Sequence, residues 1–206
     1  MHAPRSVGVV YVAFGKKALA EANQSIRTLR KNWTSKGKVH VLKRALDSSP
    51  VGLSVGQQAH WAKTCADLWS PFDYTLLLDA DTRIRSSLSV GFRALRRGWD
   101  LVMVPSEPRA EVLWHLPHED KEATFVGTGL SRPLMLNTGV LFFAKTPRTA
   151  KLFACWRSEW LRFKGWDQGA FLRAASRAPA AIWLLGLPFN SFGGEVVDHL
   201  FGRARA

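Results

Sequence analysis

Residues 74–83 read Tyr74-Thr-Leu-Leu-Leu-Asp79-Ala-Asp81-Thr-Arg83, an apolar run that ends in two carboxylates separated by one small residue. The run predicts a strand that is buried on both faces of a sheet. Ligands of open α/β sheets bind at the carboxyl ends of such strands. Two neighbouring carboxylates repel each other, so a hard divalent cation such as Mg²⁺ or Mn²⁺ is their natural partner. A solvated turn after the strand is the alternative interpretation.

The segments around this run alternate between strand and helix patterns. Continuous apolar runs predict strands over 7–14, 38–44, 134–143 and 181–185. Helical periodicity predicts helices over 18–33, 57–69, 147–163 and 167–177. The order of the first elements predicts a doubly wound sheet with helices on both sides. Residues 105–133 hold four of the ten prolines and have no sustained period, which predicts a long loop or lid.

The composition is that of one globular domain, with 206 residues, 47% hydrophobic residues and 22% charged residues. No linker divides the chain, so residues 1–206 are expected to form a single domain. The net charge of +13 arises mostly in residues 1–50, where ten Lys and Arg face two Asp and Glu. Two cysteines indicate a reducing compartment, and no stretch predicts a signal peptide or membrane span. We therefore expect a cytoplasmic protein.

Three further motifs follow the carboxylate pair in the order Asn137-Thr-Gly139-Val, Asp167-Gln168 and His199-x-x-Gly202-x-x-Arg205. Together with Asp79-Ala-Asp81 and the helix that contains Ser25-Ile-Arg-Thr-Leu-Arg30, they resemble the GT-A nucleotide-sugar glycosyltransferases. The resemblance covers nearly the whole chain and is closest to glycosyltransferase family 8, the glycogenin-like and galactosyltransferase enzymes. It implies a Rossmann-like α/β fold with a mixed central sheet flanked by helices, the nucleotide-diphospho-sugar transferase fold.

The resemblance also implies a function, the metal-dependent transfer of a sugar from a nucleotide-diphosphate sugar, UDP-linked in the first instance, to an acceptor. It implies that Asp79, Asp81 and His199 bind Mn²⁺ or Mg²⁺, and that Gly202 and Arg205 face the diphosphate. The family usually has Lys where this chain has Arg205, and the two side chains are not equivalent donors. The remaining residues implied at the donor are Ala13 and Phe14 at the nucleobase, Lys63 at the sugar or phosphate, and Ala80, Thr138 and Gly139.

Catalytic roles are implied for Asn137, Asp167 and Gln168, which match the family positions around the sugar and its anomeric carbon. Departure of the nucleoside diphosphate leaves an oxocarbenium-like sugar, which a carboxylate and an amide carbonyl stabilise. The resemblance predicts retention of configuration, and because these motifs contain no obvious nucleophilic carboxylate, front-face attack is the route considered. The acceptor, whether a saccharide, a lipid-linked group or a protein, is left open.

The sequence leaves several alternatives open. A HAD-like phosphatase also begins with an apolar strand and Asp-x-Asp, but its motif needs Thr or Val at the position of Arg83. A basic nucleic-acid-binding protein or a catalytically silent sugar-binding module would fit the charge and the aromatic content, although no nucleic-acid motif is visible and no nucleic-acid partner is expected. His199 could be an ordinary surface residue near a terminus. Peripheral contact with a membrane is a separate hypothesis, which the basic surplus and the nine Trp motivate.

Overall fold

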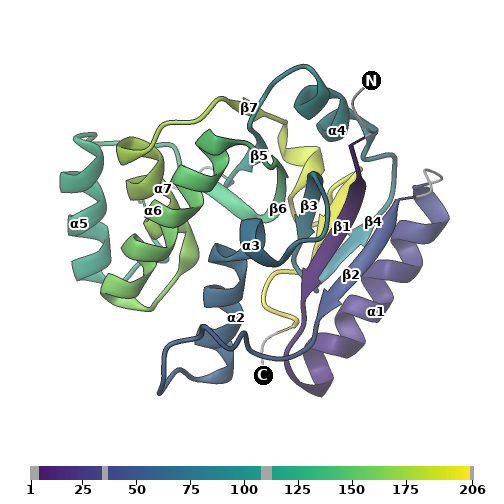
Figure 1. Cartoon of the computed structure of the whole chain (residues 1–206), viewed down its shortest axis with the longest axis horizontal. Coiled ribbons are helices and arrows are strands. Elements are labelled where there is room, and N and C mark those ends of the chain that lie inside the picture. Colours follow the sequence, from purple (N-terminus) through teal and green to yellow (C-terminus); the bar gives the residue numbers. More distant parts are fainter. Residues whose placement is uncertain (1–4, 34–36, 108–112, 205–206) are drawn as a thin grey trace.

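The computed structural model describes residues 5–33, 37–107 and 113–204. A six-stranded sheet in the order β2-β1-β3-β6-β5-β7 forms the centre, and helices cover both of its faces (Figure 1). The strands are β1 (Val7–Val12), β2 (Lys38–Leu42), β3 (Tyr74–Leu78), β5 (Leu101–Pro105), β6 (Leu136–Ala144) and β7 (Ile182–Leu184). The predicted α/β class with a mixed sheet is confirmed.

Strand β6 runs against its two neighbours in the sheet. It pairs antiparallel with β3 and β5, whereas β1 pairs parallel with β2 and β3, and β5 pairs parallel with β7. The register sets Leu78 opposite Val140, and the backbone N–H of Asp79 donates to the carbonyl oxygen of Gly139 at 2.9 Å. The start of β6 therefore lies beside the carboxyl end of β3, where the first carboxylate of the pair begins.

Two hydrophobic cores lie on opposite faces of the sheet, because successive side chains of a strand point to opposite sides. One core joins the sheet to α1 (Gly15–Asn32) and α4 (Ser89–Arg96). The other joins it to α2 (Val55–Thr64), α6 (Pro147–Phe163) and α7 (Asp167–Arg177). Its fully buried members include Trp156 and Trp160. These two tryptophans pack the core, as their spacing on the helix predicts.

The helices α6 and α7 have the predicted bounds, and α1 begins three residues earlier than its periodic pattern. The helix predicted over 57–69 divides at Cys65 into α2 and the short α3 (Ala66–Trp69). Helix α2 begins at a capping box in which Ser54 and Gln57 satisfy each other's backbone N–H groups. Because of this cap, α2 begins at Val55, two residues before the predicted start at Gln57.

The prediction of a long loop over 105–133 is wrong in its second half, which contains α5 (His118–Thr128). The buried residues of this helix are polar, Asp120 and Thr124, and both contact Arg173 of α7. Because the buried side of α5 is hydrophilic, no hydrophobic period marks it in the sequence. Helices α5, α6 and α7 lie together at the end of the molecule opposite α1 (Figure 1).

A second sheet consists of β4 (Thr82–Ile84) and β8 (Val197–His199), which pair antiparallel with Thr82 opposite His199. The short 3₁₀ helix η1 (Leu187–Phe189) precedes β8. This pairing places His199, near the C-terminus, opposite Thr82, the residue that follows the Asp-x-Asp motif. None of the helices in the described residues combines the length and the apolar character needed to span a lipid bilayer.

Candidate functional site

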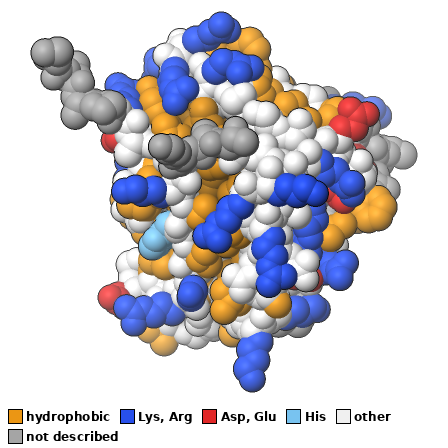
Figure 2. Space-filling model, turned by 90° about the vertical axis from the view of Figure 1, so that its right-hand side faces the viewer, with side chains coloured by type: hydrophobic (Ala, Val, Ile, Leu, Met, Phe, Trp, Pro, Cys, Tyr) orange, Lys and Arg blue, Asp and Glu red, His pale blue; other side chains and the backbone are white. Residues whose placement is uncertain are grey.

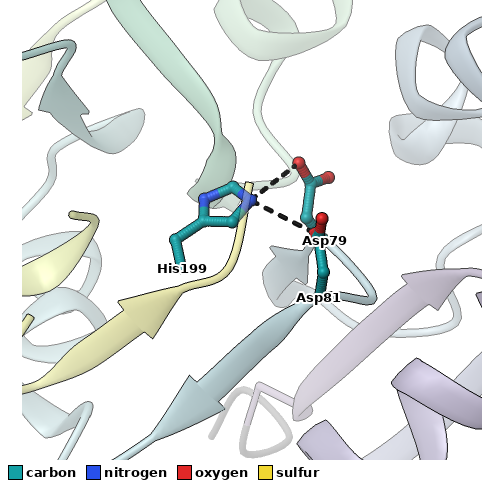
Figure 3. Close-up of side chains that lie close together, drawn as sticks. All are labelled: Asp79, Asp81 and His199. Atoms are coloured by element: carbon teal, nitrogen blue, oxygen red, sulfur yellow. Dashed lines mark ion pairs between the residues drawn. The ribbon is translucent and has the colours of Figure 1, made fainter. Parts of the chain in front are cut away.

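Three potential metal ligands converge from separate elements. Asp79 follows β3, Asp81 immediately precedes β4, and His199 is the last residue of β8. One ligand atom from each lies within 4.8 Å of the other two. The Nε2 atom of His199 lies 3.2 Å from Asp81 Oδ1 and 3.6 Å from Asp79 Oδ2 (Figure 3). The structure therefore brings together the three residues predicted to bind a metal.

The ring of His199 is held in an orientation that suits a metal ligand. Its Nδ1 lies 2.7 Å from Asn190 Oδ1, and its backbone N–H donates to Ser191 O at 2.9 Å. An amide oxygen only accepts hydrogen bonds, so the ring donates from Nδ1 and its Nε2 faces the two carboxylates. A hydrogen bond that fixes one ring nitrogen and aims the other at carboxylates is typical of metal-ligating histidines. His199 is 3% exposed, so the surface-residue alternative is wrong.

Gly139 gives the three ligands room to approach. A Cβ atom built on Gly139 would lie 2.4 Å from His199 Cε1 and 2.9 Å from Asp79 Oδ2. It would also lie 3.0 Å from Asn137 Oδ1, which accepts a hydrogen bond from the backbone N–H of Gly139 at 2.8 Å. Two carboxylates and one imidazole around this space are a ligand set that fits a divalent metal ion.

We expect Gly139→Ala to weaken Mn²⁺ binding at least about tenfold, because the added methyl group displaces His199 or Asp79 from the other ligands. Isothermal titration with MnCl₂ measures the affinity. Gly56→Ala is the matched control, since a Cβ at this exposed position in α2 meets no described atom within 4 Å apart from its chain neighbours and the helix's own backbone. Equal Mn²⁺ affinity in Gly139→Ala and the unmodified protein would contradict the assignment.

We call Asp79, Asp81 and His199 the triad. A second charged cluster lies beside the triad and contacts it through Lys63 of α2. The Lys63 ammonium lies 2.5 Å from Asp79 Oδ1 and 3.2 Å from Asp167 Oδ2. Asp167, the first residue of α7, also accepts a hydrogen bond from Thr138 Oγ1 at 3.0 Å. The cluster thus links the end of β3, the start of β6 and the start of α7, and it connects Asp167 to the triad through one lysine.

Both members of the Lys63–Asp167 pair are ionised at neutral pH. Burial works against the charge of Asp167, but the charge of Lys63 and the hydrogen bonds from His60 and Thr138 outweigh it and hold the pKa of this carboxyl far below its usual range. Burial likewise opposes the charge of Lys63, but Asp167 and Asp79 together raise the pKa of its ammonium. A buried carboxylate that keeps its charge can stabilise positive charge developing on a substrate.

The other predicted residues occupy the ends of strands and helices. Ala13 and Phe14 are buried between the end of β1 and the start of α1, Ala80 is buried between the two carboxylates, and Asn137 is 7% exposed at the start of β6. Gln168 is partly exposed in the first turn of α7. Gly202 has a left-handed φ of 81°, which glycine adopts without strain. Arg205 lies outside the described residues, which reach Ala204 on this side.

Two residues that the sequence did not single out contribute to the site. His60 lies three residues before Lys63, hence on the same face of α2, and its Nδ1 is 3.6 Å from Asp167 Oδ1. That spacing is a signal that could have found it. Asn190, which orients His199, stands in an irregular segment after η1, and no local pattern marks it.

Comparisons at the level of sequence find nothing. No protein-family model matches the chain, and no curated protein is similar to it in sequence.

The fold is similar to those of solved glycosyltransferases. Mouse xyloside xylosyltransferase 1 matches with a TM-score of 0.60 and 11% identity over 98% of this chain and 99% of that chain. Galactosyltransferase LgtC, solved with donor and acceptor sugar analogues, matches with a TM-score of 0.60 and 14% identity over 95% and 87%. A glycosyltransferase involved in glycosylation of the PBCV-1 major capsid matches with a TM-score of 0.59 and 13% identity over 97% and 98%. The predicted GT-A glycosyltransferase fold is confirmed.

Proposed function

We propose that the protein is a metal-dependent glycosyltransferase that moves a sugar from a nucleoside-diphosphate sugar, with UDP as the first candidate nucleotide, to an acceptor hydroxyl. The observation that carries this proposal is the convergence of Asp79, Asp81 and His199 at the carboxyl edge of a GT-A sheet. In open α/β sheets this edge is where nucleotides bind. The ionised pair of Lys63 and Asp167 beside the triad supplies the charge that a sugar transfer requires.

The donor is held by groups that complement its charge. Asp79, Asp81 and His199 would bind Mn²⁺ or Mg²⁺, which neutralises a diphosphate and stabilises its departure as a leaving group. Backbone at Gly202 approaches the diphosphate without a side chain in the way, and Arg205 pairs with it. Ala13, Phe14 and Ala80 border the nucleoside.

The sugar itself lies between the triad and α7. Lys63, Thr138 and Gly139 contact the donor sugar, and Asn137, Asp167 and Gln168 surround its anomeric carbon. The charge of Asp167 stabilises the oxocarbenium-like transition state. Lys63 and Thr138 both hold this carboxylate in place. The resemblance to glycosyltransferase family 8 supports transfer with retention, in which the acceptor hydroxyl attacks on the face from which the diphosphate leaves.

The assay is the release of UDP from a panel of UDP-sugars, with and without MnCl₂, followed by NMR of the product's anomeric proton. We expect Mn²⁺-dependent release with at least one donor and a retained configuration. GDP- and ADP-sugars test the choice of nucleotide. No release from any nucleotide sugar, together with no Mn²⁺ binding, would refute the proposal, and an inverted product would refute retention alone.

We also propose that residues 1–206 form one cytoplasmic domain that makes peripheral contact with an anionic membrane surface. Figure 2 shows Lys and Arg side chains spread over the face that carries α1, with fewer Asp and Glu side chains among them. The exposed cations of α1 are Lys16, Lys17, Arg27, Arg30 and Lys31. A basic face of this kind is attracted to anionic lipid. Equal sedimentation with phosphatidylserine and phosphatidylcholine vesicles would argue against such contact.

A further inference from the structure

Four aromatic side chains form a row that begins at Asp167 and ends in solvent, and we call them the ring row: His60, Trp166, His115 and Trp114. The Nδ1 atom of His60 lies 3.6 Å from Asp167 Oδ1, and its ring meets the Trp166 ring edge to face with centroids 5.8 Å apart. The ring centroids of Trp166 and His115 lie 6.0 Å apart, and those of His115 and Trp114 lie 5.5 Å apart. The row thus connects a residue proposed for catalysis with the protein surface.

The outer end of the ring row is built to expose an indole. Trp114 is 54% exposed, whereas its neighbours Leu113 and Leu116 are buried and anchor the turn in the core of the protein. Leu113 has a φ of 56°, a left-handed conformation that is uncommon for a residue other than glycine. Backbone outliers of this kind persist where the surrounding structure imposes them, and they cluster at ligand-binding sites.

Core packing accounts for the inner tryptophan of the row but not for the outer one, because Trp166 is partly buried against a hydrophobic core whereas Trp114 is 54% exposed. Trp156 and Trp160 are fully buried, and Trp61 is 8% exposed. Trp166 and Trp114 instead connect α7 to the turn before α5, and their exposure increases with distance from Asp167. An exposed tryptophan has a flat apolar face and a polar N–H at its edge, a combination that suits a ligand of mixed polarity.

We propose that the ring row is the acceptor subsite and that the acceptor is a saccharide. This inference rests on the proposed function. One face of a pyranose ring presents C–H groups and its rim presents hydroxyls, so a sugar can stack on the indole of Trp114 or Trp166. A pyranose at the inner end of the row has a hydroxyl beside Asp167, where the donor's anomeric carbon is proposed to lie.

The test uses methyl glycosides of glucose, galactose, mannose and xylose as acceptor probes, with the UDP-sugar that the protein hydrolyses as donor. We expect at least one glycoside to accelerate UDP release above hydrolysis. Trp114→Ala should raise the KM for that glycoside about tenfold and change the KM for the donor less than twofold. Trp114→Phe, which keeps a flat ring, should recover most of the loss. Trp183→Ala is the matched control, an exposed tryptophan on the edge strand β7.

Three results would overturn the assignment. They are an unchanged glycoside KM in Trp114→Ala, an equal rise of the donor KM, and acceleration by a serine- and threonine-containing peptide but by no glycoside. A failure of the proposed function has a different signature, because the unmodified protein then releases no UDP from any donor. Saturation-transfer NMR of the same glycosides still measures binding in that case, and binding that Trp114→Ala does not weaken refutes the ring row independently of turnover.

Discussion

Asp81→Asn is expected to lower the rate of metal-dependent sugar transfer by about a hundredfold to a thousandfold, since metal stabilisation of the leaving group contributes several kcal/mol. Asp81 is 5% exposed, with one carboxylate oxygen facing His199 and the other accepting the backbone N–H of Ala204 at 3.4 Å. Asparagine has one acceptor oxygen instead of two and no charge. If its oxygen faces the metal, its NH₂ group opposes the Ala204 N–H.

The measurement is the initial rate of UDP release at saturating donor and MnCl₂, together with Mn²⁺ affinity by titration. Asp198→Asn is the matched control, because Asp198 is the adjacent residue of β8 and its carboxylate pairs with Arg85 instead of the triad. We expect the control to bind Mn²⁺ as the unmodified protein does. Normal activity of Asp81→Asn would exclude Asp81 as a metal ligand.

The second large effect concerns stability. Arg173→Met is expected to lower the free energy of unfolding by about 3–5 kcal/mol, because it leaves the buried carboxylate of Asp120 without its cation and removes the buried one of the three cations around Glu159. Arg173 is fully buried on α7, where it forms an ion pair with Asp120 of α5 and donates from Nε to Glu159 of α6 at 2.8 Å. It also donates to Thr124 Oγ1 at 2.6 Å. One guanidinium therefore joins three helices.

Thermal and urea unfolding measure this loss, which corresponds to a fall in Tm of roughly 6–20 °C. Arg177→Met is the matched control, since Arg177 pairs with the same Glu159 at 2.5 Å but its side chain is 55% exposed. Ion pairs of exposed side chains contribute about 1 kcal/mol or less, so this control should change Tm little. Equal loss in the two variants would show that burial of the Arg173 network does not matter.

The elements that could be predicted from the sequence are those with a strong local pattern. Strands β1 and β3 are apolar runs because both of their faces are buried, and α6 has a periodic apolar face. Three of the elements that escaped prediction have weak patterns. Strands β4 and β8 have three residues each, and the buried side of α5 is polar. Helix α4 and strand β5 also escaped prediction, although β5 is an apolar run and α4 has a buried apolar face.

The candidate site divides in the same way. The pair of carboxylates after a buried strand could be predicted because a change from apolar to acidic residues is local. The ion pair of Lys63 with Asp167 joins residues 104 positions apart, so no local spacing encodes it. The spacing of His60 and Lys63 on α2 could have predicted that both side chains lie on one helix face. The contact of His60 with Asp167, however, depends on where α7 begins.

The sequence by itself determined the strand that ends in Asp79 and Asp81, and with it the edge of the sheet where a cation can bind. Only the tertiary structure decided what completes that site. The antiparallel pairing of β6 with β3 places Gly139 next to Asp79, and the pairing of β4 with β8 places His199 next to Asp81. The physical reason is that burial leaves a periodic trace in neighbouring residues, whereas strand pairing and side-chain contact between distant segments depend on how the whole chain packs.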